Sequence, residues 1–267
     1  MELNATFCNF ASSNNQSEIL KKQNMKTKLL FVATVLLLSL SSCRVNIGNG
    51  GEVIDPSETI SRAKYPQEAF DKVDNHVVGT IQLVQSNQSR VTLSAPENYI
   101  DLFEFKNKDG LLEIRYKKDN VNISAENITI VIYTPTLSKI KNSGAAEVRL
   151  DSLTTDRLEV NNSGVGSFSL DCLNASKVEV SCSGVGSITV SGKAVEAELE
   201  CSGVGSINAE ELKACEVDAK VSGVGSINCY ASEAIKGRVS GVGGLNYAGH
   251  PEKKDLHHSM TGGIKEI

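Results

Sequence analysis

The sequence has no tryptophan, and aromatic residues make up only 5% of its 267 positions. A surface with so few aromatic side chains offers little platform for stacking sugar rings, so glycosidase chemistry has little support. The chain also has no Cys-x-x-Cys pair, and its four histidines do not cluster into a zinc signature. No segment of the sequence has the length and periodicity of an amphipathic helix, which favours an all-β protein.

What the sequence does contain is a repeated Ser-Gly-Val-Gly block, which begins at Ser163, Ser183, Ser202, Ser222 and Ser240. Successive blocks start roughly 20 residues apart, and a steady period of this length is typical of a solenoid, in which each repeat covers the apolar face of the next. Degenerate copies around Ser143 and Ser259 extend the array, so we predict a β-solenoid with regular coils over residues 140–267.

Alignment of the blocks on their serine predicts which side chains point inward. Apolar residues occupy several columns, and five positions before the serine these residues are Leu158, Val178, Ala197, Val217 and Ile235. Apolar and polar columns alternate, which is typical of strands with one buried face. We therefore predict coils of two short strands joined by a corner whose glycines adopt positive φ. The block valines are expected to form a buried ladder, in which Val204→Asp would be severely destabilising: Val165, Val185, Val204, Val224 and Val242.

Residues 25–42 have the pattern of an export signal. Two lysines precede an apolar run from Leu29 to Leu40, which is too short to span a bilayer as a mature helix. The run ends in Leu-Ser-Ser-Cys, which resembles the bacterial lipobox, so we expect cleavage before Cys43 and lipid attachment to its thiol. The alternative is an ordinary signal peptide with a chance cysteine. Residues 1–24 are polar and without a period, and we interpret them as an extension ahead of the true start at Met25.

Residues 43–66 are rich in glycine, asparagine and polar side chains, so we expect a flexible tether there. Arg44, rather than an aspartate, resembles the pattern of lipoproteins sent to the outer membrane. The acidic run that would suggest surface export is absent after Cys43, so the side of the membrane that the protein faces stays open. Removal of residues 1–42 would take away four lysines and two glutamates, leaving 23 basic and 30 acidic residues and a net charge of −7. Nucleic acid is therefore not an expected partner.

Besides Cys8 and Cys43, the chain has five cysteines: Cys172, Cys182, Cys201, Cys215 and Cys229. In an oxidising compartment the odd number would leave at least one of them unpaired. Cys182 and Cys201 stand one position before their serines, in a column that also contains Val221 and Val239. We therefore expect small buried thiols that behave as hydrophobic residues, with a disulfide framework as the alternative.

Four residues before the serine stands an acidic column, which consists of Glu159, Glu179, Glu198 and Asp218. These side chains are expected to point outward, and the neighbouring outward columns mix positive and negative charges. Paired surface charge is our interpretation. The alternative is a cation or substrate site, in which like charges about 4.8 Å apart would raise one another's pKa. No shared position would assemble a nucleophile with its base, so we expect no catalytic residue and no cofactor.

Three segments carry a family resemblance: Phe70-Asp71-Lys72-Val73, the apolar Tyr133-Thr134-Pro135-Thr136-Leu137, and the reiterated Ser-Gly-Val-Gly-Ser-Ile. With them, residues 67–267 resemble the putative auto-transporter adhesin, head GIN domain family. Its members are exported, often lipid-anchored bacterial proteins, common in Bacteroidetes. The resemblance implies a right-handed parallel β-helix-like fold and a role at the cell envelope, but no residue-level activity. His76-Val77 departs from the Ser-Gly that the family usually has in its first coil.

Together these features predict a non-catalytic lipoprotein of the cell envelope that binds or displays, in the manner of an adhesin. The expected partners are the membrane, through the lipid on Cys43, and an envelope protein or a glycan. One alternative is an envelope-stress or scaffold component that binds a membrane protein. The other is a polysaccharide-degrading β-helix enzyme, which would work with clustered carboxylates.

Overall fold

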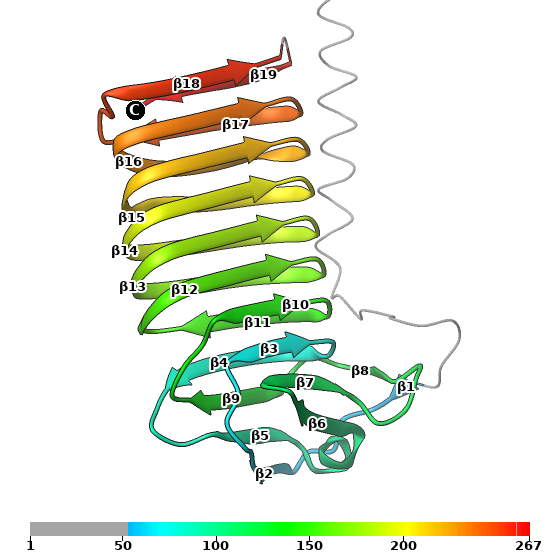
Figure 1. The fold of residues 1–267 in the computed structure, drawn as a ribbon. Coiled ribbons are helices and arrows are strands. Elements are labelled where there is room, and N and C mark those ends of the chain that lie inside the picture. Colours follow the sequence, from blue (N-terminus) through cyan, green and yellow to red (C-terminus); the bar gives the residue numbers. More distant parts are fainter. Residues whose placement is uncertain (1–52, 260) are drawn as a thin grey trace, which may run out of the picture. The chain divides into compact units, whose positions relative to one another are not determined.

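A computed structural model describes residues 53–259 and 261–267, which form a stack of β-coils (Figure 1). The predicted extension, the signal peptide, Cys43 and the first part of the tether lie outside the described residues. Within them the only helix is the short 3-10 helix η1 (Glu97–Leu102), so the all-β prediction is confirmed. No helix of this described part is long and apolar enough to cross a membrane.

The regular coils are built from strands that pair in parallel with the equivalent strand of the next coil. In chain order the strands are β10 (Lys139–Asn142), β11 (Ala145–Leu150), β12 (Leu153–Asn162), β13 (Val165–Cys182), β14 (Val185–Cys201), β15 (Val204–Val221), β16 (Val224–Val239), β17 (Val242–Ala248), β18 (Lys253–His258) and β19 (Gly262–Glu266). Val185 pairs with Val165 on one side and with Val204 on the other, as the repeat predicts. One feature differs from the prediction of two short strands. The strands β13 to β16 continue for 16 to 18 residues around the turn opposite the corner, where the register shifts.

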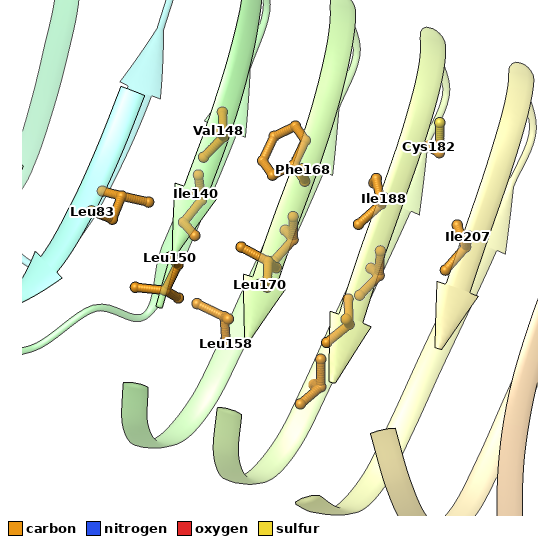
Figure 2. Close-up of a cluster of buried hydrophobic side chains, with 14 of the residues drawn as sticks. Leu83, Ile140, Val148, Leu150, Leu158, Phe168, Leu170, Cys182, Ile188 and Ile207 are labelled. Atoms are coloured by element: carbon orange, nitrogen blue, oxygen red, sulfur yellow. The ribbon is translucent and has the colours of Figure 1, made fainter. Parts of the chain in front are cut away.

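The core lies between the two strand segments of each coil. The column that begins at Leu158 is buried throughout, with 0 to 4% of each residue exposed. Leu158, Phe168 and Leu170 are drawn together with Ile188 and Ile207 of the following coils in Figure 2. Each such side chain contributes roughly 1.5–3 kcal/mol when fully buried, and stacking the coils repeats this contribution along the array.

The block valines do not belong to this core, so the predicted buried ladder is wrong. Val165, Val185, Val204, Val224 and Val242 stack in register, but between 50% and 59% of each residue is exposed. The reason is the period of two in a strand. After the serine the buried residues stand at the fifth and seventh positions, as Phe168 and Leu170 do, whereas the valine stands at the second position. Its position therefore faces outward, although the side chain is apolar.

The block glycines are required by the close approach of successive coils. A Cβ on Gly203 would stand 2.1 Å from the carbonyl oxygen of Gly184 in the preceding coil, and a Cβ on Gly205 would stand 1.8 Å from that of Gly186. Among the block glycines, positive φ occurs at the second glycines Gly166, Gly186 and Gly243, but not at the first glycine of any of the five blocks. The predicted reason, positive φ, is thus wrong for that first glycine, which instead leaves room for the neighbouring backbone.

A buried polar ladder runs beside the corners. Asn75 donates to Oδ1 of Asn142 at 2.8 Å, and Asn142 donates to Oδ1 of Asn162 at 3.1 Å. All three side chains are buried, so these bonds satisfy groups whose desolvation would otherwise be costly. Cys182 and Cys201 continue the same column as buried thiols, which confirms their predicted burial.

The end of the stack that precedes β10 is closed by strands that the repeat does not predict. The first coil consists of β3 (Lys72–Asn75) and β4 (Val78–Gln85), which pair in parallel with β10 and β11. On their other side they pair with β7 (Leu111–Tyr116) and β9 (Thr129–Thr134). Antiparallel pairs then follow, between β6 (Phe103–Lys108) and β7, β5 (Arg90–Pro96) and β9, and β2 (Ile60–Pro66) and β5. Two short strands, β1 (Val53–Ile54) and β8 (Asn122–Ile123), form a separate pair.

Strand β2 corrects the predicted extent of the tether. The tether was expected to reach residue 66, but Ile60–Pro66 pairs along its whole length with β5. Alternate residues of β2 are partly buried, so the segment has the period of a half-buried strand. Its glycine-poor sequence, ISRAKYP, also differs from that of the residues before it.

Candidate functional site

Each regular coil presents two outward surfaces, because the chain runs along one side, turns at the Ser-Gly corner and returns along the other (Figure 1). We call the surface of the segments before the corner the charged face. It contains the acidic column and the outward columns beside it, which begin at Arg157 and Asn161. The surface of the segments after the corner, from each block valine to the residue four positions after it, is the uncharged face.

The acidic column is assembled as the repeat predicts. Glu159 pairs with Glu179, Glu179 with Glu198, and Glu198 with Asp218, each in the adjacent coil. Lysines continue the column at both ends, since Lys139 pairs with Glu159 and Lys236 with Asp218.

All four acids of the column lie beside a basic side chain. Nζ of Lys139 lies 2.9 Å from Glu159 Oε1, and Nζ of Lys236 lies 2.7 Å from Asp218 Oδ2. Two short ion pairs lie in the middle of the column: Arg157 contacts Glu179 at 2.6 Å, and Lys177 contacts Glu198 at 2.5 Å. These contacts provide the paired surface charge that the mixed signs indicate.

The pKa of Glu159 moves in the direction that such pairing produces. The hydrogen bond from Lys139 lowers the pKa of this carboxyl, whereas an unpaired column of like charges would raise it. The pKa of Lys177 is raised, because Glu198 and then Glu179 accept hydrogen bonds from its ammonium group. Among the described residues, no group of three or more His, Cys, Asp and Glu side chains is placed to hold a metal ion.

The charged face is hollowed over its last coils. The hollow has a volume of about 400 Å³, and its charged lining contains both acids and lysines: Glu196, Glu198, Glu216, Asp218, Lys236, Lys253, Lys254 and Asp255. The carboxylates and ammonium groups largely compensate one another, so the hollow provides neither a concentrated charge nor a nucleophile beside a base.

The first corner keeps its shape although His76-Val77 replaces Ser-Gly. Gly144 of the next coil packs directly over it, because a Cβ on Gly144 would stand 2.2 Å from the carbonyl oxygen of Val77. Nε2 of His76 lies 3.2 Å from Asp74 Oδ1. The imidazole lines a second hollow of about 480 Å³ together with Tyr116, whose pKa is raised to about 12 by burial.

The uncharged face is the surface that the sequence patterns missed. Its outward positions form three rows, one residue per coil: the valine ridge (Val165, Val185, Val204, Val224, Val242), the serine row (Ser167, Ser187, Ser206, Ser226, Gly244) and the amide row (Ser169, Thr189, Asn208, Asn228, Asn246). No residue of the three rows carries a charge. The signal that could have revealed this face is the outward position of the valine in the alternation of each strand.

Comparison with solved structures shows the same fold. A putative adhesin from Bacteroides fragilis is 33% identical, with 80% of this chain and 100% of that chain covered and a TM-score of 0.76. A putative lipid binding protein from Parabacteroides distasonis is 19% identical, with 81% and 100% covered and a TM-score of 0.64. A putative adhesin from Parabacteroides merdae is 18% identical over the same shares, with a TM-score of 0.58. The search among curated proteins finds no match.

The family comparison agrees with the likeness to the B. fragilis protein. Residues 69–251, which span the first parallel coil and the five blocks, match the family described as putative auto-transporter adhesin, head GIN domain. The match also includes the antiparallel strands β5 and β6, which lie outside the repeat. The chain therefore belongs to the putative auto-transporter adhesin, head GIN domain family.

Proposed function

We propose that this protein is a non-catalytic binding module of the bacterial cell envelope with an adhesin-like role. A lipid on Cys43 would anchor it in the outer membrane, and the segment between Cys43 and β1 would serve as its tether. An envelope protein or a glycan would be its partner, and nucleic acid would not be, because the chain has a net charge of −5.

The observation that carries the proposal is the valine ridge. Five valines in consecutive coils are each about half exposed. They stand between glycines that pack too closely against the preceding coil to admit a Cβ. The core does not require these valines, so their recurrence in every block points to a role at the surface. Contiguous exposed apolar residues commonly mark interaction sites.

Two further observations support binding over catalysis. The carboxylates that a glycosidase would use are bound to lysine and arginine, as Glu179 is to Arg157. Membership of an adhesin-like family also supports a role in attachment at the envelope. The function thus follows from an extended surface of many weak contacts rather than from a catalytic centre.

A test of this function follows both retention and turnover. Purified mature protein is incubated with envelope and host polysaccharides, and in parallel it is used to capture partners from detergent-solubilised envelope. We expect retention on a polysaccharide or capture of an envelope protein, without new reducing or unsaturated ends. Turnover that Glu179→Gln or Glu198→Gln abolishes would contradict the proposal and favour the enzyme. Capture of an integral membrane protein without retention on any polysaccharide would still support binding, but it would favour the scaffold over the adhesin-like role.

A further inference from the structure

We propose that the uncharged face binds a neutral polysaccharide, with the glycan chain lying along the direction in which the coils stack. This inference rests on the proposed binding function and names the class of its ligand. The occupied surface would be the valine ridge, the serine row and the amide row.

The first argument is the distribution of charge. The outward residues of this face are all uncharged over five consecutive coils, whereas the charged face of the same coils has several ion pairs. Charges return at the margins of the three rows: the ion pair between Glu147 and Arg149 lies at one end and Lys265 at the other, and Asp171 and Glu210 follow the amide row at the next outward position. An anionic polymer would find no cation within these rows, and the net charge of −5 would repel it. Complementarity thus favours a neutral partner.

The second argument is the hydrogen-bonding character of the rows. Serine hydroxyls and asparagine amides each donate and accept, as sugar hydroxyls do. The amide row is also ordered, because Asn228 donates to Oδ1 of Asn208 at 2.8 Å and Asn246 donates to Oδ1 of Asn228 at 2.8 Å. Each of these bonds uses one of the two N–H groups of its donor amide. Side chains held in this way lose little conformational freedom when a ligand binds.

The third argument is the shape of the face. Coils about 4.8 Å apart and strand segments of about five residues give the rows dimensions of roughly 19 Å by 13 Å. That footprint is on the order of 250 Å², whereas a stable protein–protein interface buries roughly 800 Å² on each partner. The face is therefore small for a second copy of the chain, but it suits a slender polymer whose apolar C–H surface lies against the valine ridge.

The repeat explains how such a surface could work without aromatic platforms. Equivalent groups recur at each coil, so successive units of a polymer along the stack meet the same row of side chains. Single contacts would be weak, because no residue of the three rows is aromatic. Several copies displayed on one cell would raise the overall affinity by about 10²-fold or more, as multivalent binding does.

The experiment is affinity electrophoresis of the purified mature protein in gels that contain dextran, mannan or laminarin, with polygalacturonate as the anionic comparison. We expect retardation by at least one neutral polymer and none by polygalacturonate. Two variants test the rows: Ser206→Glu places a charge in the serine row, and Asn228→Ala interrupts the amide row. Each should raise the dissociation constant obtained from the retardation at least tenfold. Glu198→Gln on the charged face should leave it unchanged. Thermal melting of each variant would verify its fold.

Four results would overturn the inference: no retardation by any of the three neutral polymers, retardation that both variants on the uncharged face retain, stronger retardation by polygalacturonate, or loss of retardation only in Glu198→Gln. In each case the proposed binding function would stand if the protein still captured an envelope partner. It would fall if the protein cleaved a polysaccharide, which the gels would reveal as products.

Discussion

Gly205 lies against Gly186 so closely that a Cβ added to Gly205 would stand 1.8 Å from the carbonyl oxygen of Gly186. The obstructing atom belongs to the backbone of the preceding coil, so it cannot rotate away as a side chain could. The same relationship recurs at the equivalent glycines, such as Gly186 over Gly166. The second glycine of each of the five blocks thus avoids a clash with the preceding coil, whereas the degenerate coil before them accommodates Ala146 at the equivalent position.

We expect Gly205→Ala to destabilise the protein by about 3 kcal/mol or more, because it forces backbone apart in the middle of the stack. Gly263→Ala is the matched control, since a Cβ there would have no atom within 4 Å. Urea unfolding of both variants would measure the difference. Equal urea midpoints for Gly205→Ala and Gly263→Ala would show that the corner tolerates a side chain.

Because the valine ridge is exposed, a charged residue at its centre should not be severely destabilising, contrary to the prediction from the sequence. Val204 is 55% exposed, so Val204→Asp should change the free energy of unfolding by no more than about 1 kcal/mol. Val221 is fully buried in the same strand, and Val221→Asp should cost several kcal/mol because an unpaired carboxylate would lie in the core. Similar losses in both variants, measured by urea unfolding, would contradict the outward position of the ridge.

The last coil should respond to acid through Glu266. Hydrogen bonds to its carboxylate from Lys254 first, and also from His250 and Tyr247, lower its pKa from 4.5 to about 2. The stabilisation is therefore complete above pH 4.5 and is lost as the pH falls through about 2. We expect Glu266→Gln to lower the melting temperature at pH 7, with the difference from the wild type vanishing near pH 2.

The control for this pH dependence is Glu252→Gln, since Glu252 is exposed and forms no ion pair among the described residues. It should melt like the wild type across the same range. A deficit in Glu266→Gln that stays constant from pH 7 to pH 2 would rule out the carboxylate as the source.

The proposed lipid anchor predicts a mature chain that begins at Cys43. Expression in a bacterial host with a fatty-acid analogue should label the wild type and leave Cys43→Ala unlabelled. Cys172→Ala is a suitable control, because it removes an exposed thiol of the folded part. Equal labelling of the wild type and Cys43→Ala would refute the anchor.

The ion pairs of the acidic column predict little affinity for divalent cations. Calorimetry with calcium should give no heat, and millimolar calcium should not shift the melting temperature, because all four acids already face a lysine or an arginine. Calcium binding that disappears in Glu179→Gln would contradict this and restore the cation site.

Much of the candidate surface could be predicted from the sequence, provided that the alternation of inward and outward side chains along each strand is applied strictly. The four acids and their basic neighbours could be aligned from the repeat alone. Which acid contacts which base depends on the length and reach of the side chains, as when Arg157 extends to Glu179 in the next coil. The strands that close the first coil could not be aligned in this way, because β2 and β5 join Ile60 to Pro96 without a repeat between them.

The sequence by itself determined the period, the register and the buried columns other than that of the valines, because successive coils bury equivalent positions and turn at equivalent corners. The tertiary structure alone decided that the valines lie outside. An apolar side chain is buried only when its place in the alternation faces the core. In each block that inward position falls on the second glycine, where the backbone of the preceding coil leaves no room for a side chain.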